Sequence, residues 1–200
     1  MLRIFLTVSV LFWNQLAAQD PVQQMIELCD ADDCIRPVGI IEDKNYEEME
    51  YKFRQRVETE VHAVNFKNAM EIGLEKLFNY SRCGNAAGTV VPISAPWGVF
   101  GYLENGKIQQ RFRVYLQIVT EVINPPEPTD PTVETVFAPP VWYFVRGFDK
   151  KVDEEQIEER VTQLLKDLEQ DNQPFKGTFF GIGFFNTRGL MGIGFEKAGE

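Results

Sequence analysis

The only histidine of the chain belongs to a run of alternating ionisable residues, Glu58, Glu60 and His62. Two carboxylates and an imidazole could bind a metal ion or exchange protons. In a strand, however, two residues advance by about 6.6 Å, so Glu58 and His62 would lie about 13 Å apart and could not share one ion. We therefore interpret the three side chains as a solvated strand face and predict no metal site.

A carboxylate beside a tyrosine would offer acid–base chemistry. If Glu50 or Glu60 lay next to Tyr51 or Tyr143 in an apolar pocket, burial would raise the pKa of the carboxyl group and make it a general acid or base. This pairing supports an alternative function, a small-molecule hydrolase or another enzyme. Nucleophilic catalysis is disfavoured, because no nucleophile stands near His62 in the sequence.

Two glycines lie between pairs of phenylalanines in segment 178–185, and a second glycine-rich run covers 189–194. A phosphate-binding loop needs a helix after its glycines, and no helical pattern follows here. Glycine in an aromatic strand more often marks strong sheet curvature or the close approach of a ligand. We expect most of the aromatic side chains to form core, with an apolar ligand pocket as the alternative for some of them.

The elements that would position these residues follow two periods. From Val57 the alternation of apolar and polar residues predicts a strand within 46–66, and a spacing of three and four from Asn68 predicts a helix ending at a left-handed Gly84. A strand at 112–118 is followed by the proline-rich loop 124–131, which divides the chain.

The second half repeats this order. It has a strand at 141–148, a helix with Asp153 as N-cap and a strand at 178–185. We therefore predict an α+β fold, a pseudo-twofold repeat of strand–helix–strand units in which two helices pack on a distorted antiparallel sheet or barrel. The matching order, rather than residue identity between the halves, supports the repeat.

The composition limits the partners. The 200 residues include 20 Lys and Arg against 30 Asp and Glu, a net charge of -10. This sign disfavours binding to nucleic acid or to an anionic membrane. Residues 1–18 have one basic residue, a short apolar run from Ile4 to Trp13 and a small Ala17–Ala18 pair, which is typical of a cleaved secretory signal peptide. We expect a secreted, extracellular protein that begins near Gln19 and has no membrane contact after cleavage.

Export would place the cysteines in an oxidising compartment. Cys29 and Cys34 lie in an N-terminal arm, 19–45, and Cys83 follows the first predicted helix. One disulfide is expected, and the sequence leaves all three pairings open. The triplet at 79–81 makes Asn79 a candidate glycosylation site on the surface.

Several short motifs resemble, in order and spacing, the SOUL family of haem-binding proteins over about residues 40–196. The matching residues are Tyr46, Glu47 and Tyr51; Val57, Thr59 and Val61; Ala69, Gly73, Leu77, Tyr80, Gly84 and Asn85; Ala95 and Pro96; Pro125, Pro126 and Pro128; and Val145, Arg146, Phe148 and Asp149. The resemblance implies a single SOUL-like domain at 46–200 with a capacity to bind haem or another tetrapyrrole non-covalently and without a common catalytic activity, which favours a binding protein over an enzyme.

The resemblance also locates a ligand site and shows one departure. Some family members carry a haem-ligating histidine where this chain has Glu50, and a carboxylate is a poor substitute at haem iron. We therefore expect a haem, a related tetrapyrrole or another planar apolar ligand in a groove, with little axial ligation. The candidate contacts are Glu50, Tyr51, Met70, Leu74, Trp142, Phe144 and Phe180.

Overall fold

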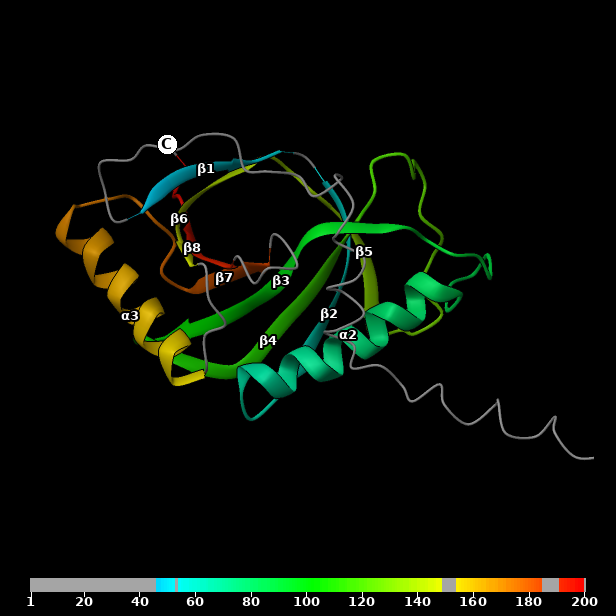
Figure 1. The fold of residues 1–200 in the computed structure, drawn as a ribbon, viewed down its shortest axis with the longest axis horizontal. Coiled ribbons are helices and arrows are strands. Elements are labelled where there is room, and N and C mark those ends of the chain that lie inside the picture. Colours follow the sequence, from blue (N-terminus) through cyan, green and yellow to red (C-terminus); the bar gives the residue numbers. More distant parts are fainter. Residues whose placement is uncertain (1–45, 53, 149–153, 185–190, 200) are drawn as a thin grey trace, which may run out of the picture.

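The computed structural model describes residues 46–52, 54–148, 154–184 and 191–199. Over these segments it forms one eight-stranded sheet and two helices (Figure 1). The strands are β1 (Glu47–Tyr51), β2 (Arg54–His62), β3 (Ile93–Glu104), β4 (Lys107–Ile118), β5 (Val133–Ala138), β6 (Val141–Phe148), β7 (Phe179–Phe184) and β8 (Met191–Glu196). The helices are α2 (Phe66–Arg82) and α3 (Glu154–Gln170).

The strand order reveals the repeat. Across the sheet it is β1-β6-β8-β7-β3-β4-β2-β5, and all neighbouring pairs are antiparallel. The central strands β7 and β3 are equivalent under a pseudo-twofold axis, which relates β2–α2–β3–β4 to β6–α3–β7–β8 and edge strand β5 to edge strand β1. The predicted α+β fold is confirmed, and the sheet is curled into a half-barrel (Figure 1).

The repeat differs from its predicted form in two ways. Each unit contains a hairpin after its helix, so it has one more strand than the predicted strand–helix–strand unit. The proline-rich loop also does not separate the halves, because β5, which follows the loop, pairs with β2 of the first unit. Proline content marks a loop, whereas strand pairing across that loop depends on tertiary contacts.

Helix α2 begins slightly earlier than predicted and ends differently. The side chain of Asn65 accepts a hydrogen bond from the backbone N–H of Asn68 at 2.9 Å, which caps the first turn. At the other end the N–H of Gly84 donates to the carbonyl of Asn79 at 2.8 Å. The predicted left-handed Gly84 is wrong, because the described glycines with positive φ are Gly88 and Gly106. Glycine is required at 84 by proximity, since a Cβ there would lie 2.6 Å from Asn79 Nδ2.

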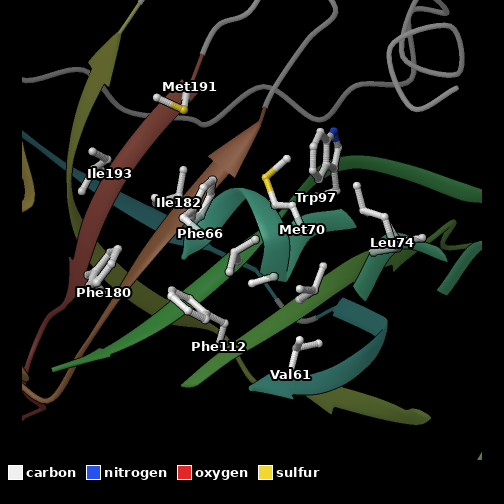
Figure 2. Close-up of a cluster of buried hydrophobic side chains, with 14 of the residues drawn as sticks. Val61, Phe66, Met70, Leu74, Trp97, Phe112, Phe180, Ile182, Met191 and Ile193 are labelled. Carbon is white, nitrogen blue, oxygen red and sulfur yellow. The ribbon is translucent and has the colours of Figure 1, made fainter. Parts of the chain in front are cut away.

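Both helices cover the same face of the sheet and enclose the core. The apolar side of α3 buries Ile157, Val161, Leu164 and Leu168, as its periodicity predicts. Helix α2 approaches β4 so closely that a Cβ at Gly73 would lie 2.4 Å from a methyl group of Val114. Figure 2 shows Met70 and Leu74 of α2 among core side chains of β3, β4, β7 and β8.

Several predicted features lie outside the described residues. These are the signal peptide at 1–18, the arm at 19–45 with Cys29 and Cys34, and the N-cap Asp153. Cys83 is exposed and is the one cysteine among the described residues, so the structure describes no disulfide partner for it, and Asn79 is exposed on α2. The disulfide, the glycosylation and the signal peptide stay predictions.

Candidate ligand-binding groove

A groove runs across the face of the sheet opposite the helices, and all eight strands contribute to its wall. It has about 580 Å³ of space between its walls, counted up to a mouth that is open to solvent. The lining residues are Tyr51, Lys52, Arg54, Arg56, Phe100, Tyr115, Gln117, Ala138, Pro139, Val141, Tyr143, Val145, Gly181, Gly183, Gly192 and Gly194.

The connection from β1 to β2 closes one end of the groove. Strand β1 is one edge of the sheet, whereas β2 is next to the other edge, β5. Only three residue steps separate Tyr51 from Arg54, so their Cα atoms lie within about 11 Å of each other. The two edges of the sheet therefore approach at this end, and residues from both edges line a single groove.

Glycines form much of the groove floor. Gly181 pairs with Gly194, and Gly183 pairs with Gly192, between the adjacent strands β7 and β8. A Cβ at Gly181 would lie 3.1 Å from the ring of Phe100. Absence of a side chain therefore lets that aromatic ring lie against the sheet, which agrees with the sequence-based expectation of close approach at these glycines.

Aromatic side chains form the walls in two pairs. The rings of Phe100 and Tyr115 are stacked with centroids 5.1 Å apart, and Tyr51 meets Tyr143 edge to face at 5.2 Å. A Cβ at Gly98 would lie 2.8 Å from the hydroxyl oxygen of Tyr115, so this ring also depends on a facing glycine. Such walls suit a flat apolar ligand.

The groove tyrosines are held in the neutral form. Burial raises the pKa of Tyr115 to about 12 and raises the pKa values of Tyr51 and Tyr143 well above the ordinary value for tyrosine. A haem iron is ligated by tyrosine through its phenolate. At neutral pH these residues therefore offer ring surface and a hydroxyl group rather than a metal ligand.

Beneath one wall runs a ladder of alternating charges on β2 and β4. Arg56 Nε lies 2.5 Å from Glu58 Oε2, and Arg113 Nη1 lies 3.1 Å from Glu58 Oε1. Arg111 Nη2 lies 2.7 Å from Glu60 Oε2 and so continues the ladder toward solvent. The guanidinium of Arg56 also lies 5.3 Å from the centre of the Phe100 ring, a cation–π distance.

The predicted solvated face is wrong for Glu58 and right for His62. The Glu58 side chain is 1% exposed, whereas the His62 side chain is 76% exposed. Register explains the difference: Glu58 lies opposite Tyr115 and between two arginines, while His62 lies at the end of β2 opposite Arg111. The sequence alternation gives the face of each residue but not what covers that face.

The acid–base pairing predicted for an enzyme does not form with these residues. Glu50 pairs with Trp142 in register, so it lies on the sheet face opposite that of its neighbour Tyr51. Glu60 accepts a hydrogen bond from Arg111, which lowers the pKa of Glu60, whereas the enzyme hypothesis required a raised pKa. Burial instead raises the pKa of Glu58, although Arg56 and Arg113 oppose the shift. Within the described residues, no carboxylate lines the groove.

The sequence-predicted ligand contacts separate into three groups. Tyr51 lines the groove. Trp142 is 46% exposed, and Glu50 is half-buried beside it on the helix-covered face. The remaining four, Met70, Leu74, Phe144 and Phe180, are buried in the core between the sheet and the helices. Whether a ligand touches any of the seven stays a prediction.

Sequence reasoning did not select most of the groove residues. Arg54, Phe100, Tyr115 and Gln117 come from strands whose two faces are both largely covered, so no polar–apolar alternation marks the groove face. One sequence signal could have identified Arg54 and Arg56 as groove residues: by the two-residue period of a strand they lie on the same face as Glu58.

The described part of the chain contains no helix long and apolar enough to cross a membrane. Nor does it contain a group of three or more His, Cys, Asp or Glu side chains that could hold a metal ion.

Comparison with known proteins identifies the fold and the family. The structure resembles the C-terminal domain of EcmrR, with a TM-score of 0.56 and 9% sequence identity over 78% of this chain and 99% of that one. It also resembles a hydrolase from Listeria innocua, with a TM-score of 0.50 and 7% identity over 76% and 91% of the two chains. These similarities show the fold alone.

No curated protein matches the sequence significantly. The family model described as SOUL heme-binding protein matches residues 37–188, which is most of the chain. The motifs identified in the sequence, from Tyr46 to Asp149, all lie within this range. The chain therefore belongs to the SOUL heme-binding protein family.

Proposed function

We propose that this protein binds haem or another planar tetrapyrrole non-covalently in the groove, outside the cell and without catalysing a reaction on it. The family supports a haem-type ligand. The single observation that carries the location is the glycine floor between two pairs of aromatic rings, on the sheet face away from the core.

The residues of the groove fit a flat ring. Gly183 and Gly192 are paired neighbours and present no side chain, so a ring can approach the backbone there. Each 100 Å² of apolar surface removed from water contributes about 2.5 kcal/mol. Because the mouth is open, one edge of a bound tetrapyrrole would remain in solvent.

Recognition is expected to rest on the ring rather than on the metal. Haem would supply an iron that accepts axial ligands, but the groove contributes neutral tyrosines, and His62 lies on an exposed strand end. Apolar contact and stacking act equally on a ring with or without iron. The structure therefore supports binding that does not depend on iron.

We expect haemin and metal-free protoporphyrin to bind with affinities within about threefold of each other, a difference under roughly 0.7 kcal/mol. Ala138→Trp, at the groove wall, should weaken both at least tenfold by filling the space. Phe137→Trp is the matched control, because residue 137 precedes it on β5, points to the other face and is exposed. Absorbance and fluorescence titrations would measure these affinities.

The same titrations include His62→Ala, which should change haemin affinity by less than about threefold. Loss of binding and of the Soret shift in this variant, with the fold intact, would show a histidine-ligated site instead. Equal affinities of the Ala138→Trp protein and the wild-type protein would show that the ligand does not bind in the groove. No saturable binding of either compound would favour the alternative class, an enzyme.

We also propose export through a cleaved signal peptide, which the sequence pattern at 1–18 supports. The chain expressed in a secreting host should appear in the medium with its N-terminus within two residues of Gln19. Intact-mass and N-terminal peptide mass spectrometry would measure this end. A secreted product that retains residues 1–18 would contradict the proposal.

A further inference from the structure

Arg54 lines the groove with a guanidinium that is only partly satisfied by the protein. Its Nη1 donates a hydrogen bond to Gln117 Oε1 at 3.1 Å. Its Nε is buried and has no hydrogen-bond partner among the described residues. In that same part of the chain, no carboxylate lies within salt-bridge distance of Arg54. A buried donor on a charged group without an acceptor is costly, so the geometry calls for an anionic partner.

The other groove cations do not compete for that role equally. Arg56 is already paired with Glu58, and Glu58 is shared with Arg113. Lys52 is an exposed residue of the groove lining, so its charge is solvated. Arg54 therefore carries the positive charge that remains available inside the groove.

The surroundings of Arg54 determine what kind of anion can reach it. Arg54 pairs in register with Ala138, and Tyr51 lies three residues away, so apolar and aromatic surfaces flank the guanidinium. The planar fork of a guanidinium matches the two oxygens of a carboxylate better than it matches a point charge. The whole chain is acidic, at a net charge of -10, so this cationic spot is a local exception that would attract an acid selectively.

We propose that Arg54 is the anion-recognition residue of the groove, which therefore selects planar apolar molecules that carry a carboxylate over their neutral counterparts. The inference rests on the proposed function, because it assigns the polar end of the same ligand. The apolar ring lies on the glycine floor, and its carboxylate reaches Arg54 near the end where the two sheet edges approach.

The test compares a porphyrin diacid with its neutral diester. Wild-type protein should bind protoporphyrin at least tenfold more tightly than protoporphyrin dimethyl ester in fluorescence titrations at one fixed detergent concentration. Arg54→Gln should lower the affinity for the diacid at least tenfold and leave the affinity for the diester within threefold. Arg54→Lys, which keeps the charge but not the fork, should fall between wild type and Arg54→Gln for the diacid.

Arg111→Gln is the control, because Arg111 belongs to the charge ladder but does not line the groove. It should leave both affinities within threefold of wild type. Thermal unfolding of each variant separates a folding defect from a binding defect. Equal affinity of the wild-type protein for diacid and diester would overturn this inference alone, as would an equal loss of both ligands in a folded Arg54→Gln protein. Absence of saturable binding of both porphyrins would overturn the proposed function and the inference with it.

Discussion

Replacing Phe144 by alanine is expected to lower the free energy of unfolding by about 4 kcal/mol. Phe144 is 0% exposed on the helix-covered face of β6, where its ring meets that of Tyr46 edge to face at 5.7 Å. Its removal leaves a cavity at the junction of β1, β6 and β8. For a chain of this length the midpoint of thermal unfolding should fall by roughly 10 °C.

A second substitution of Phe144 distinguishes a role in the core from direct contact with the ligand. Phe144→Leu should cost only about 1 kcal/mol and leave protoporphyrin affinity within twofold, because the groove lies on the other face of the sheet. Trp142→Ala, two residues away on the same face, is the matched control and should cost less than about 1 kcal/mol because its side chain is 46% exposed. A Phe144→Leu protein of nearly wild-type stability that loses binding would place the ring against the ligand.

Replacing Arg113 by methionine is expected to lower the free energy of unfolding by about 3 kcal/mol. Arg113 is one of the two cations that hold the carboxylate of Glu58, a side chain with 1% exposure. Without Arg113 that carboxylate is left buried with a single partner. Chemical denaturation at pH 7 would measure the loss.

The loss should grow as the pH rises from acid to neutral. Burial already raises the pKa of Glu58, and removal of Arg113 raises it further. A carboxyl group whose folded-state pKa is raised contributes stability below its unfolded-state pKa, and this contribution is lost as the pH rises through the folded-state value. Arg111→Met is the comparison: it removes the hydrogen bond that lowers the pKa of Glu60, so its loss should also grow with pH, but by less, since Glu60 is more exposed than Glu58. A pH-independent loss in Arg113→Met would instead indicate that packing of the arginine stem dominates.

Local patterns in the sequence identify some of the elements and miss others. The spacing of Met70, Leu74 and Leu77 predicts α2, and alternation from Val57 predicts β2. Strands β3, β5 and β8 have no such signal. Strand β3 is largely buried on both faces and carries glycines at 98 and 101, where the rings of Tyr115 and Phe180 pack. Its polarity therefore does not alternate, and its hydrophobicity does not distinguish strand from buried helix.

The groove shows the same limit more strongly. Tyr51 could be selected from the family motif, whereas Arg54, Phe100 and Tyr115 become neighbours only because β1, β2, β3 and β4 curl around one space. Arg54, Phe100 and Tyr115 stand 15 to 61 positions apart in the chain and meet in these walls only through strand register. A single sequence contains no direct record of that register, since each strand could pair with several others.

By itself, the sequence determined the α+β class, the two helices, the order of the repeated units and the family, because these depend on local periodicity and on motifs in a fixed order. It also determined that His62 lies on the polar side of its strand. Tertiary structure alone decided that Glu58 is buried between two arginines, that Phe144 and Phe180 belong to the core, and that the groove lies on the face away from the helices. The physical reason is that alternation assigns a side chain to one of two faces, whereas burial and charge pairing depend on which distant strands cover that face.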